Sequence, residues 1–269
     1  MLHDKTVFLK KSKILPFVEM RKATKSNVCY QAHSHDEFSF GIIDTGTAKY
    51  INMNRTNTLN AGDTVTINPG DTHSCNPSSE DWSYRMLFVD THWIGKIQSE
   101  ITDCWNEDYQ PFSNLLENDE SFSKQFKLLF DSLLNDSDRL LSETLLIAFI
   151  KQSISTKAHI TKQEEKPCLV KVRELLLDNL NLNHSLSDLS KESGLSRFHL
   201  LRSFKKRYGC SPHSMLMDER IKKARLMLQS GCSLIDASNQ LGFSDQSHFQ
   251  RSFKKHLAIT PKQYQTFFI

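Results

Sequence analysis

An eight-residue pattern that occurs twice near the C-terminus constrains the fold of this 269-residue chain more than any other feature. The pattern, His-x-x-Arg-Ser-Phe-Lys-Lys, runs over residues 199–206 and again over residues 248–255. A proline follows each copy, Pro212 after the first and Pro261 after the second. Because self-similarity at a fixed spacing marks a structural unit that occurs more than once, we expect the same helices to flank both copies.

Helix-start signals precede both copies of the pattern. Residues 185–188 and residues 233–236 both read Ser-Leu-x-Asp, which is the spacing of a capping box at the start of a helix. A turn that contains glycine follows each of them, and the repeated pattern then begins a second helix. The sequence therefore predicts two helix-turn-helix units, a first unit over about residues 185–208 and a second unit over about residues 233–256.

The residues between the two units predict one connecting helix. Ser211 precedes Pro212 in the arrangement of an N-cap followed by a proline in the first turn. Apolar residues recur at helical spacing over residues 212–230, and Gly231 ends the pattern. Since a helix rises about 1.5 Å per residue, this one is about 27 Å long. The second helices of the two units could then lie about 34 Å apart, so that one chain could reach two successive major grooves of DNA.

The two copies with their turns, residues 194–206 and residues 242–255, closely resemble the signature of AraC/XylS-type transcriptional regulators. The resemblance covers about residues 168–269 and implies that they form an all-α DNA-binding domain. It implies a sequence-specific regulator, which we expect to be an activator, with double-stranded DNA and RNA polymerase as partners. It also implies that the preceding residues bind a small-molecule effector and that the protein is not an enzyme.

The charge distribution agrees with this assignment. Residues 168–269 hold 16 Lys and Arg against 8 Asp and Glu, a net charge of +8, whereas residues 1–167 hold 18 against 23, a net charge of −5. A basic module beside an acidic one is typical of a nucleic-acid-binding protein with a separate sensing domain. Surface lysines that only aid solubility would give the same charge, but they would not give the repeat.

Helix geometry selects the side chains that can reach DNA bases. At 3.6 residues per turn, Leu200 and Phe204 of the first unit, and Phe249 and Phe253 of the second, face the interior. The exposed fronts then carry the candidate base-contacting residues, which are Arg197, Phe198, Leu201, Arg202, Gln246, Ser247, Gln250 and Arg251. Arg can bind guanine, and Gln can bind adenine, with two hydrogen bonds. The alternative for the two arginines of the repeated pattern is a salt bridge to a neighbouring helix.

Basic residues beside these fronts are candidate contacts to the DNA phosphates. They are His199, Lys205, Lys206, His248, Lys254 and Lys255. Such contacts attract DNA of any sequence and position the protein on it. The two histidines could instead pack at the starts of their helices, and the lysine pairs could be solvated surface.

Short alternating segments in the first third of the chain predict an antiparallel β-structure. Apolar and polar residues alternate over residues 37–43, 48–53, 64–67 and 84–89, and glycines and prolines separate these segments. Regular short strands with such turns are typical of a sandwich or a barrel. We therefore expect a two-domain α+β protein, in which residues 1–155 form a cupin-like antiparallel β-barrel with helices and the all-α domain follows.

The cupin expectation comes from a second resemblance. His33-x-His35 and the segment Pro-Gly-Asp-Thr-His73 resemble two conserved stretches of cupins, a barrel fold that commonly forms the effector domain of AraC-type proteins. A metal-binding cupin usually carries a glutamate a few residues beyond its second histidine, whereas Glu37 comes too early. Imidazoles suit zinc or iron, and residues 33 and 35 would share one face of a strand. His33, His35 and His73 are therefore candidates for a divalent metal site, although no cofactor is required.

The favoured interpretation of these histidines is a small-molecule pocket. The expected pocket residues are His33, His35, Glu37, Tyr50, His73, Trp82 and Arg85. We expect the effector to be an amino-acid-like or other small polar metabolite. Structural histidines are a third interpretation, and an enzyme whose histidines activate oxygen or a carbonyl group is the alternative class of function. Fusion to a DNA-binding module favours sensing.

Two helical patterns follow the predicted strands. Apolar residues recur at helical spacing over residues 122–133 and residues 141–150, and these helices must cover the barrel. An apolar face beyond that need would pair with a second copy of the chain, so we expect a homodimer. Packing against the chain's own barrel would explain most of the same residues. The polar residues 156–167 predict an interdomain linker.

The remaining features bear on the compartment. Six cysteines are scattered along the chain without C-x-x-C spacing, as in a reducing environment. The sequence shows no signal peptide pattern and no apolar run of about 18 residues that could span a membrane. We therefore expect a cytoplasmic protein without a membrane partner.

Overall fold

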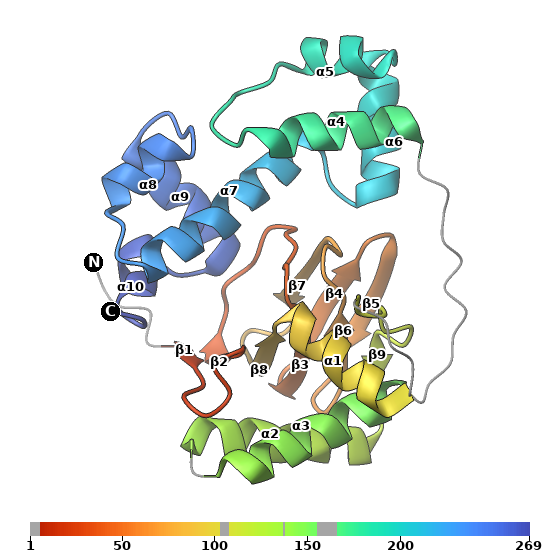
Figure 1. Cartoon of the computed structure of the whole chain (residues 1–269), viewed down its shortest axis with the longest axis vertical. Helices are drawn as coiled ribbons and strands as arrows, with labels where there is room; N and C mark the ends of the chain where they lie inside the picture. The colour runs from red at the N-terminus through yellow and green to blue at the C-terminus, as the bar shows by residue number, and fades with distance from the viewer. Residues whose placement is uncertain (1–5, 103–107, 137, 155–165) are drawn as a thin grey trace.

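The computed structural model describes residues 6–102, 108–136, 138–154 and 166–269. These residues form a sheet domain, which ends at Ile154, and a helical domain, which begins with the helix at Pro167 (Figure 1). The predicted order, an antiparallel β-domain followed by an all-α domain, is confirmed. The predicted linker over residues 156–167 lies outside the described residues except at its last two positions, and the second of these already belongs to a helix.

The strands form two antiparallel sheets. The larger sheet has the order β1 (Val7–Lys11), β2 (Val18–Ser26), β8 (Trp82–Val89), β3 (Phe38–Thr45), β6 (Thr64–Ile67) and β9 (Leu116–Glu117). The smaller sheet has the order β5 (Arg55–Leu59), β4 (Ala48–Asn52) and β7 (His73–Pro77). The four predicted strand segments correspond to β3, β4, β6 and β8, whereas the sequence patterns indicated none of the other five.

Three helices among the described residues complete the sheet domain. They are α1 (Thr91–Thr102), α2 (Glu120–Asn135) and α3 (Arg139–Ile154). The last two match the predicted helical patterns, and they pack side by side on the far side of the sheets from the helical domain (Figure 1). Phe126 and Phe149 of these helices join Phe38, Phe40 and Leu87 of the larger sheet in one buried apolar cluster. No helix in the described part of the chain is both long and apolar enough to cross a membrane.

The helical domain contains seven helices among the described residues. They are α4 (Pro167–Asp178), α5 (Leu186–Ser193), α6 (Arg197–Tyr208), α7 (Pro212–Gln229), α8 (Leu234–Gln240), α9 (Gln246–Leu257) and α10 (Pro261–Gln265). The first unit is thus α5 and α6, the second unit is α8 and α9, and α7 is the predicted connecting helix. We call α6 and α9 the recognition helices, because each is the second helix of its unit.

Side-chain caps explain why these helices begin where they do. The first backbone N–H groups of a helix lack partners within the helix, and an N-cap oxygen accepts from one of them. The caps of α5 to α10 are, in order, Ser185, Ser196, Ser211, Ser233, Asp245 and Thr260. The predicted capping boxes and the prolines that follow Ser211 and Thr260 are therefore confirmed.

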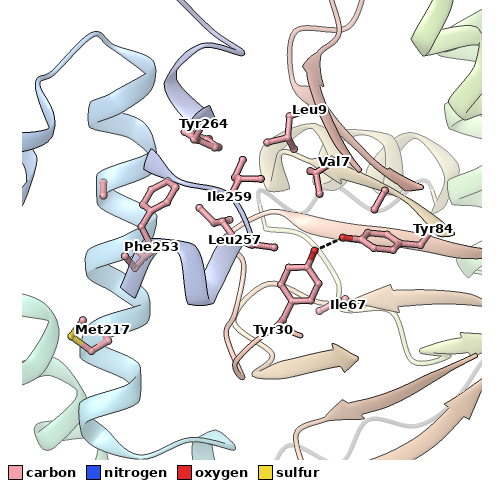
Figure 2. Packing of buried hydrophobic residues seen from close by; sticks show 14 of the residues in the cluster. Val7, Leu9, Tyr30, Ile67, Tyr84, Met217, Phe253, Leu257, Ile259 and Tyr264 are labelled. Carbon is pink, nitrogen blue, oxygen red and sulfur yellow. Dashed lines mark hydrogen bonds between the residues drawn. The ribbon is translucent and has the colours of Figure 1, made fainter. Parts of the chain in front are cut away.

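The two units are packed in different apolar clusters. Leu189, Leu200 and Phe204 of the first unit, together with residues of α4, form a cluster of their own, which we call the first-unit core. Phe249 and Phe253 of the second unit instead belong to a cluster that continues through α7 and α10 into both sheets, which we call the shared core. Figure 2 shows its continuity, with residues of the helical domain beside residues of the first strands.

One buried arginine of α7 ties the two units together. Arg220 is 2% exposed, and its guanidinium donates to the carbonyl oxygens of Leu180 at 2.6 Å, Leu182 at 3.0 Å and Gly242 at 3.0 Å. The first two carbonyls lie in the loop between α4 and α5, and Gly242 lies in the turn of the second unit. Gly242 has a φ of +70°, and a Cβ there would lie 2.2 Å from the carbonyl oxygen of Asn181. Only glycine allows this close approach of the loop to the turn.

Candidate functional site

A cavity of about 80 Å³ lies between the two sheets, and residues of the helical domain form part of its wall. Its wall is mainly apolar, with Leu9, Ile43, Val65, Ile67 and Met86 among its residues. Five of the seven residues expected in a pocket line it, namely His33, His35, Tyr50, His73 and Trp82. The helical domain contributes Arg225, Leu257 and Tyr264.

The other two residues expected in the pocket do not line the cavity. Arg85 binds Asp44 at 2.7 Å and Asp131 at 3.3 Å, and its guanidinium lies over the ring of Phe130. It therefore contacts α2 on the opposite face of the larger sheet. Glu37 lies in a neighbouring polar cleft against α7.

Three histidines converge at one end of the cavity. The ring centroids of His33, His35 and His73 lie 4.6 to 4.9 Å apart, and one possible ligand nitrogen of each lies within 4.8 Å of the others. The expectation that His33 and His35 share the face of a strand is wrong, because both precede β3. Instead, the backbone of His33 pairs with that of His73 at the start of β7, with N···O distances of 2.9 and 2.8 Å. This pairing brings the histidines together from distant parts of the sequence.

Hydrogen bonds set the protonation of two of these rings. The Nδ1 atoms of His33 and His73 lie 2.7 and 3.0 Å from the carbonyl oxygens of Gln31 and Asp71. Since a carbonyl only accepts, each Nδ1 carries the proton and each Nε2 keeps its lone pair. Burial lowers the pKa of His33 to about 4 and that of His73 to about 3, and it holds the pKa of His35 well below its usual value. All three rings are therefore neutral at pH 7.

A buried cation lies in the cavity wall, and sequence reasoning missed it. Arg21 of β2 is 6% exposed, and its Nη2 donates to the hydroxyl of Tyr30 at 2.7 Å and to the carbonyl oxygen of Leu257 at 2.8 Å. The Tyr30 hydroxyl is also hydrogen-bonded to that of Tyr84 at 2.6 Å, as Figure 2 shows. The Nε of Arg21 and the indole Nε1 of Trp82 are buried without hydrogen-bond partners among the described residues.

Charged residues of α7 attach the helical domain to the mouth of the cavity. Asp218, Lys222 and Arg225 are each at least nine-tenths buried, and their spacing places them on one face of the helix. Asp218 accepts from the backbone and the hydroxyl of Ser34, and Lys222 binds Asp36 at 2.9 Å. Sequence reasoning missed this contact, and the i, i+4, i+7 spacing of these three residues is the signal that could have indicated it.

Arg225 is the second guanidinium in the cavity wall, and its charge is compensated. Its Nη2 lies 3.3 Å from Glu19 and 3.8 Å from Glu37, and its Nε donates to the hydroxyl of Tyr264. Arg21, in contrast, makes no ion pair with any described residue. The two cations of the cavity therefore differ in whether a carboxylate already accompanies them.

The candidate DNA-binding surface lies on the recognition helices. The four front residues of α6, from Arg197 to Arg202, are exposed, and those of α9 are exposed or half-buried. Leu200, Phe204, Phe249 and Phe253 are fully buried, as helix geometry predicted. Within the described residues the side chains of Arg202 and Arg251 make neither a salt bridge nor a hydrogen bond, so neither is held in the salt bridge to a neighbouring helix that the alternative requires.

The candidate phosphate contacts occupy the same surface. The lysines of both pairs, at 205–206 and 254–255, are exposed, as is His199. His248 is half-buried, and it lies against the ring of Phe243 and 3.2 Å from the Ser244 hydroxyl. This histidine packs at the start of its helix, so its phosphate contact is the less favoured of its two interpretations.

Comparisons with known proteins agree with both domains. The AraC-like ligand binding domain matches residues 18–150, and a Helix-turn-helix domain matches residues 189–266. The HTH-type transcriptional regulator YbfI of Bacillus subtilis (strain 168) is 32% identical over 169 residues, which cover 61% of this chain and 61% of the relative. The lactose operon transcription activator of Staphylococcus xylosus is 32% identical over 97 residues, which cover 34% of this chain and 35% of the relative.

The overall fold also occurs in a solved structure. Wild-type ToxT from Vibrio cholerae strain SCE256, with bound unsaturated fatty acid, superposes with a TM-score of 0.56 at 15% identity, and the match covers 100% of this chain and 98% of that one. The matched stretches span less than two thirds of the length of the two curated relatives. Both family models nevertheless match this chain, the ligand-binding domain first and the helix-turn-helix domain after it. This chain therefore belongs to the AraC family of transcriptional regulators.

Proposed function

We propose that this protein is a DNA-binding transcription activator controlled by a small-molecule effector that is held between its two domains. The observation that carries the proposal is the composition of the cavity wall, in which Arg225, Leu257 and Tyr264 complete a surface built by the sheets. A ligand in the cavity therefore touches the domain that holds both helix-turn-helix units. The proposed role is binding rather than catalysis, because the similar proteins are transcriptional regulators.

On DNA, α6 and α9 enter successive major grooves from one chain. The separation fits because α7 has 18 residues, a length of about 27 Å, and one DNA turn is about 34 Å. Arg202, Arg251 and Gln250 read base edges, and the exposed lysine pairs neutralise phosphates. RNA polymerase is the partner that such an activator recruits to the promoter.

The cavity favours an apolar carboxylic acid over the small polar metabolite that the sequence suggested. The wall is mainly apolar and its polar groups gather at the histidines and arginines, so a ligand with polar groups along its whole length would leave some of them without partners, at a cost in binding free energy. Two guanidinium groups, Arg21 and Arg225, offer charge-assisted hydrogen bonds to a single acidic group. The fatty acid bound to ToxT, a protein of the same fold, is a ligand of this chemistry.

Exposed apolar side chains on α2 and α3 support a homodimer. Leu128, Leu140 and Leu141 are 61%, 74% and 48% exposed, and Ile147 is 39% exposed. The opposite faces of the two helices pack on the larger sheet, so these four side chains are not needed to cover it. They form the additional apolar face that the sequence analysis expected to pair with a second copy of the chain. A second copy of the chain is the proposed occupant, and Leu140→Glu should convert the dimer to a monomer in sedimentation analysis.

The proposed function is tested by DNA binding of the full-length protein with and without a cavity ligand. A selected operator and a scrambled duplex are titrated by fluorescence anisotropy in the presence of decanoate. We expect decanoate to change the affinity of the wild-type protein for the operator but not that of Ile67→Trp, whose larger side chain fills the cavity. No preference for the operator, or the same ligand effect in both proteins, would contradict the proposal.

A divalent metal ion is a second candidate occupant of the histidine cluster. Three neutral imidazoles converge there, and backbone carbonyls hold His33 and His73 in the tautomer that leaves Nε2 free, which is the usual arrangement of metal-binding histidines. Metal analysis of natively purified protein decides this role. One metal per chain that is lost in His73→Asn, with a lower melting temperature after chelation, would establish it. A chelator without effect would leave the histidines as pocket wall.

A further inference from the structure

The inference concerns the buried guanidinium of Arg21, and it rests on the proposed function of the cavity. A buried cation is costly unless a counter-charge accompanies it. Arg225 has Glu19 and Glu37, whereas the partners of Arg21 are a tyrosine hydroxyl and a backbone carbonyl. Arg21 is therefore the cavity cation with an open place for an anion.

The hydrogen bonds of Arg21 show how an anion would enter. A carboxylate binds an arginine best through two parallel N–H groups, here Nε–H and the neighbouring N–H of Nη2. The Nε–H is unpaired, but both hydrogens of Nη2 are in use, one on Tyr30 and one on Leu257. A carboxylate that takes both positions must displace one of these two acceptors.

The two acceptors differ in how they are held. Tyr30 belongs to the sheet domain, as Arg21 does, and its hydroxyl is held by the 2.6 Å bond to Tyr84. Leu257 is the last residue of α9, so the bond from Arg21 crosses between the domains. Its carbonyl is one of the last carbonyls of the helix, which have no N–H partner within the helix. The carbonyl of Lys255, two residues earlier, accepts from the backbone N–H of Gln31 at 3.3 Å.

We propose that the acidic group of the effector binds Arg21 through Nε and Nη2 and displaces the carbonyl of Leu257. The C-terminal end of α9 then loses the hydrogen bond from Arg21 and keeps the one from Gln31. It also loses its contact with a positive charge, which the helix dipole favours at that end. Occupation of the cavity is thereby transmitted to one recognition helix. Arg21 is the effector-binding residue, and the C-terminal end of α9 is the element that responds.

The first test measures the preference for an acid over an alcohol of equal length. Decanoate and decanol are titrated against full-length protein by calorimetry. Wild-type protein should bind decanoate more tightly, by roughly 10- to 100-fold, the range for a hydrogen-bonded charge. Arg21→Gln should lose this preference but keep its affinity for decanol, Arg21→Lys should keep part of it, and the matched variant Arg225→Gln should keep most of it. Loss of the preference in Arg225→Gln but not in Arg21→Gln would overturn the proposal.

The second test follows the response of α9 by amide hydrogen exchange. Decanoate should raise the exchange of residues 255–260 in wild-type protein, and decanol should not. In Arg21→Gln, which lacks the guanidinium, decanoate should leave the exchange of α9 unchanged. An equal rise in Arg21→Gln, or no rise in wild-type protein that binds decanoate, would show that an acid on Arg21 does not displace the carbonyl of Leu257.

These outcomes separate the inference from the proposed function. If neither decanoate nor decanol binds the wild-type protein, the proposed cavity ligand is wrong. If both bind equally well and alter DNA affinity, the cavity is an effector site but Arg21 does not hold an acidic group. Circular dichroism and the retained affinity for decanol establish that Arg21→Gln is folded.

Discussion

The two helix-turn-helix units share the pattern His-x-x-Arg-Ser-Phe-Lys-Lys, but they have different surroundings. The first unit packs in the first-unit core, with α4 as its neighbour. The second unit packs in the shared core, which continues into both sheets. The same residues therefore build one unit whose apolar cluster includes no described residue of the sheet domain and another whose apolar cluster continues into it.

The C-terminal ends of the recognition helices sharpen this difference. At α6, the sheet domain donates neutral groups, the hydroxyl of Thr72 to the carbonyl of Tyr208 at 2.7 Å and the amide of Asn54 to that of Lys206. At α9, one of the two donors is the guanidinium of Arg21, which also lines the cavity. In the proposed function the repeated pattern binds DNA twice, and the surroundings of the second copy supply the proposed route for control.

Of the changes considered, acidification should have the largest effect, and it should lower the stability of the shared core more than that of the first-unit core. Burial lowers the pKa of His73 to about 3 and that of His33 to about 4, whereas both titrate near 6.5 in the unfolded chain. As the pH falls below about 6.5, the unfolded chain takes up protons that the folded chain does not, until the pH reaches about 4 to 3. The contribution of these neutral rings to the free energy of unfolding is therefore fully present above about pH 7. It is lost as the pH falls from about 6.5 to about 4 to 3.

Urea unfolding of metal-free protein at about pH 7 and about pH 5 measures this loss. The transition of the shared core should move to much lower urea, while the first-unit core should respond less. The matched variant His73→Asn cannot take up the proton, so its pH dependence should be flatter. Equal acid sensitivity of both cores, or the same pH dependence in His73→Asn, would show that the lowered pKa values of these histidines do not control the stability of the shared core.

The second largest loss of stability is expected when one buried phenylalanine in either unit is replaced by alanine. Phe204 and Phe253 hold equivalent positions in the repeated pattern, and both are fully buried. Either change to alanine should cost about 3–5 kcal/mol. Hydrogen exchange should show Phe204→Ala destabilising α4 to α6 alone, whereas Phe253→Ala should also raise exchange in β1 and β2. Exchange that rises over the same residues in both variants would remove the distinction between the cores.

Substitutions on the DNA-binding surface should have intermediate effects. Arg202→Ala and Arg251→Ala should each cost about 1–3 kcal/mol on the operator and relax its sequence preference. Decanoate should change the free-energy cost of Arg251→Ala but not that of Arg202→Ala, because α9 ends at the cavity and α6 does not. The control Lys254→Ala should weaken binding to operator and scrambled DNA alike and reduce the salt slope by about one. Equal losses on both DNAs for Arg202→Ala would show that it does not read bases.

The smallest effects belong to the helix caps of the two recognition helices. Ser196→Ala removes the oxygen that accepts from His199 and should lower the stability of the first-unit core by about 1 kcal/mol. Asp245→Asn keeps an acceptor for His248 and removes only the charge at the start of α9. Its effect should be smaller and should vanish at high salt. Thermal unfolding at two salt concentrations measures both, and a salt-independent loss in Asp245→Asn would contradict the dipole argument.

Local signals in the sequence were enough to predict the helical domain. Ser185, Ser233 and Pro212 mark helix starts by interactions within one turn, so their spacing alone carries the information. The strands β1 and β2 lacked such a signal. Lys22 and Lys25 make β2 resemble a solvated segment, although Met20 and Ala23 in it are fully buried. Its burial depends on β8 and on the helical domain, which no local pattern reveals.

The cavity could be predicted only in part for the same reason. The histidines and Tyr50 were found because they lie near recognisable turns and strands in the sheet domain. Arg21 and Arg225 were missed, since a lone arginine on a strand or a helix is most often solvated surface. Both become buried only when α7 and α9 dock on the sheets. Docking between domains joins residues far apart in the sequence, such as Arg21 and Leu257, which are 236 positions apart.

The clamp formed by Arg220 has a consequence for the promoters that this protein can serve. Its bonds to the loop before α5 and to the turn before α9 prevent the two recognition helices from rotating independently. DNA turns by about 34° for each base pair. One added base pair between the two half-sites would therefore turn one major groove away from its helix. In the proposed binding mode, a base substitution in that spacer should cost less DNA affinity than the insertion or deletion of one base pair there.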